Sequence, residues 1–202
     1  MSVASLLTYL HFLMISPPEM EILLPIRCSD RSEPINITLT NIGEFGLLRK
    51  ARPNIKAHLH TGIDIRRPSN NYVNEPIYSI SEGLVLSKRD DGPYAQLIIE
   101  HEVNGLIFWT VYEHVASIAV GVGEKVDSEE PIAHFMNKNE LDKYGWQFDH
   151  FHFEILKKFP QKNKPTSRHP QRFFRSYTLE CFSKVNLDEY FYDPINFLEQ
   201  HL

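Results

Sequence analysis

The chain has 202 residues, of which 42% are hydrophobic and 23% charged, a composition that supports one sizeable buried core. Its formal net charge is -5 and its pI is about 6.1. This balance disfavours a nucleic-acid-binding protein, because phosphate binding needs a concentrated positive surface. We therefore expect a single globular domain with appendages.

The first residues form an apolar run whose meaning is ambiguous. Residues 3–15 suit the core of a signal peptide but fall short of the ~20 residues that span a bilayer. Against a secretory signal, no Lys or Arg precedes Arg27, and no A-x-A-like site precedes Ser16. An export signal and a later start at Met20 are both open, and we treat residues 1–42 as an N-terminal extension.

Cys28 and Cys181 are the two cysteines of the chain. Without a C-x-x-C pair they indicate neither a cysteine zinc site nor a disulfide scaffold. We expect two buried free thiols, with a disulfide between them in an oxidising compartment as the alternative.

Short apolar runs punctuated by Gly and Pro predict strands in the middle of the chain. These runs cover residues 76–80, 83–86 and 131–135. The clearest element is a hairpin, since residues 96–101 and 106–112 are rich in β-branched and aromatic side chains and flank Asn104-Gly105, which tolerates a tight primed turn. Helical periodicity is weak, so we expect an antiparallel, all-β core from about residue 54 to residue 156.

An H-F-H motif lies within one of these predicted strands. Because side chains alternate along a strand, His150, His152 and Glu154 share one face, while Phe151 and Phe153 share the other. Side chains two apart lie roughly 6.5–7 Å apart at their bases. One histidine can therefore ligate a metal while its neighbour reaches a metal-bound water.

An H-T-G-I-D motif runs from His60 to Asp64. In a straight strand these two residues would be about 13 Å apart, too far to share an ion with bonds near 2 Å, so the chain must bend. We expect Gly62 to supply the freedom for this bend, and Ile63 to begin a strand. The glycine and Pro68 speak against a helix.

The two motifs together offer the side chains of a catalytic zinc site. Two imidazoles and one carboxylate are a set that such an ion takes, with a further histidine left beside it. Each motif alone is weak, because the chain has ten histidines. A third element, Tyr112-Glu113-His114 at the end of the hairpin, strengthens the interpretation of a metallohydrolase.

In order and spacing, the chain resembles the lysostaphin-like (LytM-type) zinc metallopeptidases, which cut peptide cross-bridges of bacterial peptidoglycan. The matching pieces are F-G-L-L-R at 45–49, H-T-G-I-D at 60–64, Y-E-H at 112–114, G-E-K-V at 123–126 and H-F-H-F-E at 150–154. The resemblance implies a mainly β fold with an antiparallel sandwich or barrel-like core of the duplicated hybrid motif type. We expect a metallopeptidase domain at 43–156, followed by a basic loop and a tail at 157–202 that packs on it.

Carried over residue by residue, the resemblance makes His60, Asp64 and His152 the ligands of one Zn²⁺ ion. It makes His150 and His114 the catalytic histidines. The site would carry a net charge of +1, so that zinc-bound water can lose a proton near neutral pH. We expect His150 to act as the base and His114 to donate a hydrogen bond to the developing oxyanion.

Other polar residues near the motifs have plainer interpretations. His58 is a weak alternative ligand, because the family pattern places the ligand at the histidine followed by x-G-x-D. His101 and His134 lie within predicted strands and are expected to be structural. Tyr112 is expected to pack or to position His114, and Glu154 either orients a histidine or is a simple strand residue.

The sequence departs from the family in two places. Residues 136–148 contain one glycine, where many relatives carry a Gly- and Ser/Thr-rich loop that borders the cleft, so substrate preference does not transfer. Residues 157–175 hold seven basic and no acidic residues with three prolines, which indicates an extended loop. We expect a solvated linker there, with contact to an anionic wall polymer as the alternative. Residues 193–198 then predict a short helix that packs back.

The predicted function is hydrolysis of peptide cross-links in peptidoglycan, with no nucleic-acid partner and no stable membrane span. The alternative is a regulator that retains zinc and binds peptidoglycan without catalysis, although no ligand or catalytic histidine is lost. A lipoyl-type or biotinyl-type carrier is disfavoured, because no Lys lies in the required setting at a hairpin tip. Because such a hydrolase acts outside the cytoplasmic membrane, we expect a location in the periplasm or cell envelope, or secretion, with a phage or cytoplasmic origin as the alternative.

Overall fold

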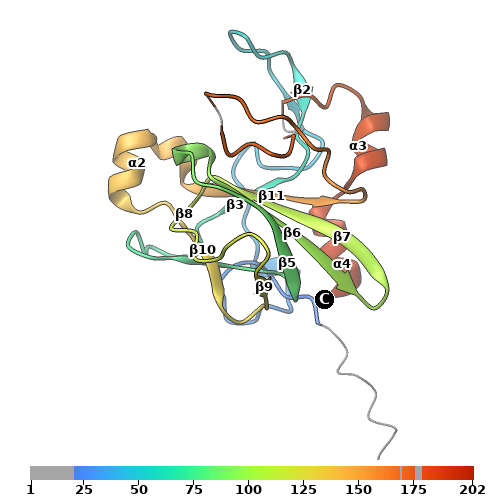
Figure 1. The fold of residues 1–202 in the computed structure, drawn as a ribbon. Helices are drawn as coiled ribbons and strands as arrows, with labels where there is room; N and C mark the ends of the chain where they lie inside the picture. Colours follow the sequence, from blue (N-terminus) through green and yellow to red (C-terminus); the bar gives the residue numbers. More distant parts are fainter. Residues whose placement is uncertain (1–20, 169, 176–178) are drawn as a thin grey trace, which may run out of the picture.

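The structure is a computed structural model that describes residues 21–168, 170–175 and 179–202. The fold is mainly β, and its strands pair antiparallel, as the sequence predicts (Figure 1). The strands are β1 (Leu48–Arg49), β2 (His58–Leu59), β3 (Ile63–Arg66), β4 (Pro76–Tyr78), β5 (Gly83–Arg89), β6 (Gln96–Val103), β7 (Leu106–Glu113), β8 (Val115–Ala116), β9 (Lys125–Val126), β10 (Pro131–Phe135), β11 (His150–Leu156) and β12 (Phe191–Tyr192). The helices are η2 (Pro34–Asn36), η3 (Gly92–Tyr94), α2 (Lys138–Tyr144), η4 (Trp146–Phe148), α3 (Lys184–Tyr190) and α4 (Pro194–His201).

One large sheet forms the centre of the molecule. Its strands follow the order β12-β11-β7-β6-β5-β9, and β3 pairs with β11 off this path. Two smaller sheets have the orders β4-β10-β8 and β1-β2. Within the described residues the large sheet stays open and does not close into a barrel.

The predicted hairpin is present as β6 and β7. Val103 pairs with Leu106, and the two residues between them, Asn104 and Gly105, have φ angles of 51° and 81°. Positive φ at both positions is the geometry of a type I′ turn, which matches the right-handed twist of the arms. The Asn-Gly pair thus fixes where β6 ends and where β7 begins.

Strand β11 shows the alternation that the sequence predicts. Phe151, Phe153 and Ile155 are fully buried in the main hydrophobic core. The side chains between them point to the opposite face, where His152 and Glu154 are also buried. Because β11 lies between β3 and β7, this histidine face is held at the middle of the sheet (Figure 1).

The main core also takes side chains from outside residues 43–156. Ile22, Leu24 and Ile26 are buried in it, and Phe197 and Leu198 of α4 join it from the C-terminal end. The N-terminal residues are fixed by backbone hydrogen bonds, such as that from Leu23 N to Ile80 O at 2.7 Å. The predicted boundaries at 43 and 156 remain a prediction, and the core extends across both.

Helix α2 is an element that the sequence analysis did not expect. Asn137 and Glu140 form a capping box, since each side chain accepts a hydrogen bond from the other's backbone N–H, at 3.0 and 2.8 Å. Gly145, with a φ of 114°, ends the helix, and Leu141 is fully buried beneath it. The segment that departs from the family pattern is therefore an ordered helix at the left of Figure 1.

The C-terminal tail packs back as predicted. The Asp193 side chain caps α4 by accepting hydrogen bonds from the N–H groups of Ile195 and Asn196, and Pro194 occupies the first turn. Cys181 is a buried free thiol, whereas Cys28 is a free thiol that is only partly buried. No helix among the described residues is long and apolar enough to cross a membrane.

Candidate metal centre

His60, Asp64 and His152 converge on one point and form the one candidate metal cluster among the described residues. Nε2 of His60 lies 3.1 Å from Oδ1 of Asp64 and 2.9 Å from Nδ1 of His152. That Nδ1 lies 3.1 Å from the same carboxylate oxygen. Three donors that each bind one ion at about 2 Å are at most about 4 Å apart, so this spacing fits a single ion.

The pairing of β3 with β11 sets this geometry. Asp64 lies directly opposite His152 in the ladder, and His60 lies just before β3 begins. Gly62 is needed here for a reason that differs from the predicted one. Its φ is not positive, but a Cβ at this position would lie 2.1 Å from the carbonyl oxygen of Phe153. The glycine allows two backbones to approach closely, which brings His60 over the carboxylate.

Hydrogen bonds fix the tautomers of both histidines in the cluster. His60 donates from Nδ1 to the carbonyl oxygen of Glu44 at 2.9 Å, and His152 donates from Nε2 to Oε1 of Glu154 at 2.9 Å. Thr61 donates from its hydroxyl to the same oxygen of Glu154. Since these partners are acceptors, the other ring nitrogens of a neutral His60 and His152 carry lone pairs that face each other. Glu154 thus orients a histidine, one of the two roles considered for it.

These three electron-pair ligand atoms, Nε2 of His60, Oδ1 of Asp64 and Nδ1 of His152, are close enough together to need a cation between them. Two lone pairs and a carboxylate oxygen within about 3 Å repel one another unless a proton or a metal ion lies among them. Burial disfavours a charged His152, yet its hydrogen bonds with Asp64 and Glu154 raise the pKa of His152 to about 10. These contacts favour a positive charge at the centre of the cluster, which a bound metal ion would supply.

Asp64 is held on both of its carboxylate oxygens. Oδ1 faces the cluster, whereas Oδ2 accepts a hydrogen bond from Nη2 of Arg49 at 2.6 Å. Burial alone would raise the pKa of Asp64, but its close contacts with His152 and His60 hold that pKa well below its usual range. The sequence motif contained Arg49, but its contact with the carboxylate was not predicted. The carboxylate is thus kept ionised and aimed at the cluster.

His150 lies beside the cluster at a greater distance. Its Nε2 is 3.8 Å from Oδ1 of Asp64, too long for a hydrogen bond. Burial is the main cause that lowers the pKa of His150 to about 4, so the imidazole is neutral at pH 7. A neutral ring one step away from the candidate ligands is free to accept a proton.

His114 faces His150 from the end of β7. The two ring centroids are 5.4 Å apart in an edge-to-face arrangement. His114 has a φ of 64°, a left-handed conformation that is uncommon for a non-glycine residue, and it donates from Nδ1 to the carbonyl oxygen of Pro93 at 2.6 Å. Burial lowers the pKa of His114, with Glu113 opposing that shift. A neutral His114 therefore presents an Nε2 lone pair, which accepts rather than donates.

Two further histidines among the described residues, His58 and His101, lie outside this arrangement. His58 is buried and donates from Nδ1 to the carbonyl oxygen of Lys56 at 2.8 Å, so it does not join the cluster. His101 is fully buried, with Nδ1 2.8 Å from the oxygen of Glu82 and Nε2 2.8 Å from the hydroxyl of Thr110, as a structural histidine would be. Tyr112 packs in the main core on the far side of the sheet.

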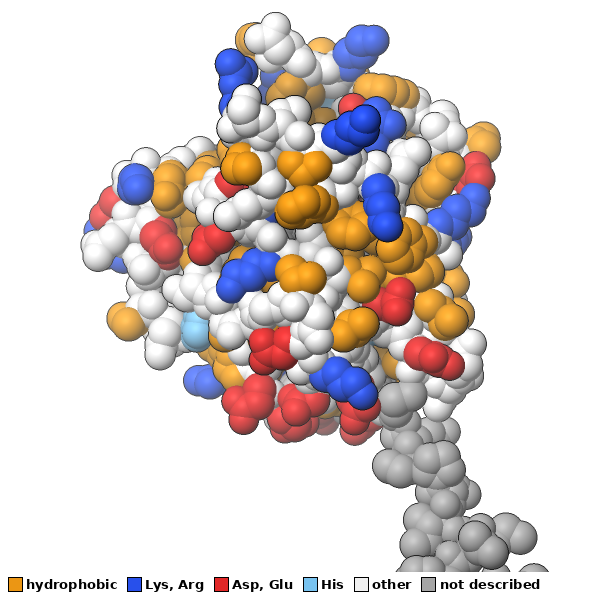
Figure 2. Space-filling model, viewed as in Figure 1, with side chains coloured by type: hydrophobic (Ala, Val, Ile, Leu, Met, Phe, Trp, Pro, Cys, Tyr) orange, Lys and Arg blue, Asp and Glu red, His pale blue; other side chains and the backbone are white. Residues whose placement is uncertain are grey.

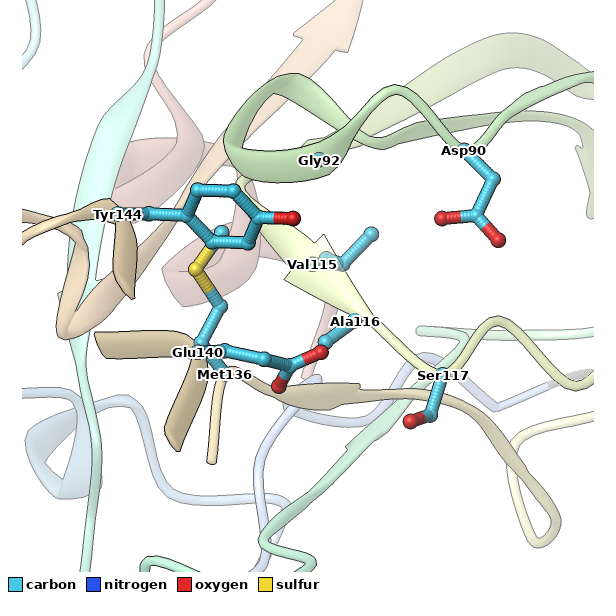
Figure 3. A pocket seen from close by; sticks show the side chains of 8 residues that line it. All are labelled: Asp90, Gly92, Val115, Ala116, Ser117, Met136, Glu140 and Tyr144. Atoms are coloured by element: carbon cyan, nitrogen blue, oxygen red, sulfur yellow. The ribbon is translucent and has the colours of Figure 1, made fainter. Parts of the chain in front are cut away.

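A pocket of about 210 Å³ lies between β8 and α2. Val115 and Ala116, which follow His114 in the chain, line it together with Asp90 and with Glu140 and Tyr144 of α2. Figure 3 shows the Tyr144 hydroxyl and the carboxylates of Asp90 and Glu140 directed into this space. The unexpected helix thus forms one wall of this pocket.

Comparison with known proteins gives one family. A family model of peptidase family M23 matches residues 58–166, just over half of the chain and a range that contains the whole cluster. No curated protein matches the chain.

Several solved structures are similar at low identity. A zinc-containing peptidase from Vibrio cholerae is 24% identical with a TM-score of 0.45, over 67% of this chain and 37% of that one. The antimicrobial peptidase lysostaphin from Staphylococcus simulans is 17% identical with a TM-score of 0.48, over 83% and 52%. A variant of the catalytic domain of the prophage-encoded M23 protein EnpA from Enterococcus faecalis is 23% identical with a TM-score of 0.43, over 68% and 88%. The chain thus spans little more than a third of the Vibrio cholerae protein and about half of lysostaphin.

Proposed function

Because the chain belongs to peptidase family M23, we propose that it is a zinc-dependent endopeptidase that hydrolyses peptide cross-links of bacterial peptidoglycan. The observation that carries the proposal is the convergence of His60, Asp64 and His152 within about 3 Å, beside two neutral imidazoles. A purely structural metal site would be closed by a fourth protein ligand, and the described residues supply three.

The three residues would hold zinc through Nε2 of His60, Oδ1 of Asp64 and Nδ1 of His152. Their outer hydrogen bonds, to Glu44, Arg49 and Glu154, leave these atoms directed at the centre. When bound, zinc acts as a Lewis acid that polarises a carbonyl and makes water a nucleophile near neutral pH.

The two further histidines divide the proton transfers between them. His150 and His114 are neutral at pH 7 because burial lowers the pKa of each, so either can accept the proton of the attacking water. His114 was expected to donate to the oxyanion. With Nδ1 committed to Pro93, His114 can donate from Nε2 only after it has gained a proton. We therefore assign it first the role of an acceptor, and then that of a donor to the oxyanion or to the leaving amine.

Family membership and the resemblance support peptidoglycan as the substrate class. A hydrolase that acts on this polymer must work outside the cytoplasmic membrane, so we propose a location in the periplasm or cell envelope. Helix α2 occupies the segment that departs from the family pattern, so we propose no bond preference by transfer from relatives.

Digestion of purified peptidoglycan, with mass analysis of the products and a count of bound zinc, tests the proposal. We expect wild type to hold one zinc ion per chain and to release peptide fragments. His152→Ala should lose both zinc and activity, and His150→Ala should keep zinc and lose activity. His134→Ala, a half-buried histidine outside the site, is the matched control and should retain both.

Two outcomes would contradict the proposal. Wild type without stoichiometric zinc would remove the metal from the mechanism. Zinc-loaded wild type that binds peptidoglycan but releases no fragments would instead support the regulator considered from the sequence.

A further inference from the structure

We propose that the basic segment, residues 157–175, positions His114 by anchoring the loop that accepts its Nδ1 hydrogen bond. The inference deepens the proposed function and rests on it for its catalytic consequence. It names Arg172 as a positioning residue that does not touch the substrate.

The anchor consists of contacts between residues 81 positions apart in the chain. Arg172 donates from Nε and Nη2 to Oδ2 of Asp91, at 3.1 and 2.9 Å. Its neighbour Gln171 accepts a hydrogen bond from the backbone N–H of Asp90 at 2.9 Å. Two successive residues of the basic segment therefore hold two successive residues of the loop between β5 and β6.

The anchored loop leads directly to His114. Asp91 precedes the short helix η3, and the Pro93 carbonyl in that helix accepts the 2.6 Å hydrogen bond from His114 Nδ1. The ring of Tyr94 also lies 6.0 Å from the His114 ring, centroid to centroid. A shift of this loop would move the one acceptor that fixes the His114 tautomer.

Asp91 is held by shorter contacts with Arg172 than with Arg89. Nη2 of Arg89 lies 3.2 Å from Oε2 of Glu113. Nε of Arg89 and Oδ1 of Asp91 are 3.7 Å apart, beyond hydrogen-bond distance. Both of these buried atoms lack a hydrogen-bond partner among the described residues. Asp91 therefore depends on Arg172 for its charge-assisted hydrogen bonds, which are the stronger kind.

Other charges of the basic segment are also used within the molecule. Lys158 pairs with Glu189 at 2.5 Å and Arg175 with Glu180 at 2.8 Å, while Lys157 donates to the carbonyl oxygen of Asp188 at 2.7 Å. On the face shown in Figure 2, Lys and Arg side chains are scattered among acidic and apolar ones rather than gathered into one field. Most residues of the segment are exposed, as expected of a solvated loop, and these pairings favour an internal role for its paired charges over contact with an anionic polymer.

Loss of the anchor should change the proton position on His114. Neutral imidazole has two tautomers, and the Pro93 carbonyl selects the one with hydrogen on Nδ1. If the loop is released, the Nε2–H tautomer becomes accessible, and in that tautomer Nε2 can no longer accept a proton. A merely structural role for Arg172 would lower stability without moving this tautomer equilibrium.

The test compares Arg172→Ala with Arg175→Ala in the full, zinc-loaded chain. Arg175 is the matched control, since it lies in the same segment and forms an ion pair that does not reach the loop. Nitrogen chemical shifts of ¹⁵N-labelled histidine report the tautomer, with the His114 signal assigned from its loss in His114→Gln. We expect wild type and Arg175→Ala to hold the Nδ1–H form, and Arg172→Ala to gain the Nε2–H form. Arg172→Lys, which keeps the charge but loses the paired donors, should fall between them.

Kinetics on peptidoglycan fragments provide the second measurement. Arg172→Ala should lower kcat roughly tenfold, because a small misplacement of a catalytic group is costly, while KM changes less than about twofold. An unchanged His114 tautomer in Arg172→Ala, or an Nε2–H form in wild type, would overturn the inference. If Arg172→Ala fails to fold, the His114 tautomer is compared between Arg172→Lys and wild type, and an unchanged tautomer overturns the inference. If wild type cleaves nothing, the proposed function fails, and the tautomer comparison alone decides about the anchor.

Discussion

Glu154 lies next to the candidate metal ligands without being one of them. Its buried carboxylate accepts hydrogen bonds from His152 and from the hydroxyl of Thr61. A carboxylate in this position raises the basicity of the imidazole and fixes its orientation, and loss of such a partner commonly costs a factor of about 10 to 100 in metal affinity.

We therefore expect Glu154→Gln to weaken zinc binding by about tenfold, since the amide keeps the acceptor oxygen but loses the charge. Competition against a chelator at pH 7.5 measures the zinc Kd. Glu102→Gln makes the same change at an exposed position of β6 and should leave the Kd unchanged. Equal affinities for the two variants would show that Glu154 does not tune His152.

His101 makes stability depend on pH through its burial. Desolvation is the main cause that lowers the pKa of His101 to about 4 in the folded chain, against about 6.5 when unfolded. Above pH 6.5 both states are neutral and the full stability is present. As pH falls from 6.5 towards 4, the unfolded chain binds a proton that the folded chain does not, so stability is lost.

Between pH 7.5 and pH 5.0, this one group should lower the free energy of unfolding by about 2 kcal/mol. Denaturant unfolding measures the free energy of unfolding of wild type and His101→Gln at both pH values. The pH-dependent change in this free energy is then compared between the two proteins. The variant should lose about 2 kcal/mol less than wild type over this interval, although it is less stable at pH 7.5. His134→Gln controls for the removal of a histidine, and the idea is refuted if His101→Gln shows the full wild-type slope.

The pairing of β3 with β11 depends on one glycine. A Cβ at position 62 would meet the oxygen and carbon of the Phe153 backbone at 2.1 and 2.8 Å, so two paired segments would have to separate. Because backbone atoms cannot rotate away as a side chain does, the strain falls on the ladder that sets Asp64 opposite His152.

Gly62→Ala should therefore destabilise the fold by about 3 kcal/mol or more and reduce bound zinc. Gly121→Ala is the control, because the nearest atom to its new Cβ is 3.6 Å away and its φ is not positive. Denaturant unfolding and zinc content of the two variants give the comparison. Equal stability of both would mean that the close approach at Gly62 is not required.

Elements with a strong local pattern were predictable, and elements set by distant contacts were not. The hairpin β6-β7 follows from Asn104-Gly105 and its flanks, and β11 follows from strict alternation. Helix α2 is too short for a periodic signal, although Asn137-x-x-Glu140 spells a capping box that would have indicated its start. The buried place of Ile22, Leu24 and Ile26 depends on partners such as Ile77, far along the chain.

The candidate site shows the same division. Its side chains stand in motifs, so the sequence alone brought His60, Asp64 and His152 into one hypothesis. The acceptors that set the tautomers of His60 and His114 are the backbone carbonyls of Glu44 and Pro93. Every residue has such a group, and only the fold decides which one faces a histidine. The order of proton acceptance and donation that we propose for His114 depends on one such carbonyl, which no motif names.

The hydrophobic core includes residues well before the H-T-G-I-D motif at 60–64. Ile26 is 1% exposed and bridges to Ile77, whereas Ile35 in the same N-terminal segment is 87% exposed. If the segment 21–42 were only an appendage, both isoleucines would tolerate truncation. Since the core includes Ile26, it should contribute to global stability and to the geometry of the sheet above it.

We expect Ile26→Ala to lower the free energy of unfolding by about 2–5 kcal/mol, from lost apolar burial and the cavity that remains. Ile35→Ala removes the same atoms from an exposed position and should change it by less than about 0.5 kcal/mol. Unfolding followed by near-UV and far-UV circular dichroism should give the same single transition with both signals in each variant. A loss in Ile26→Ala confined to a separate early transition would mean that the N-terminal segment docks on a domain that folds without it.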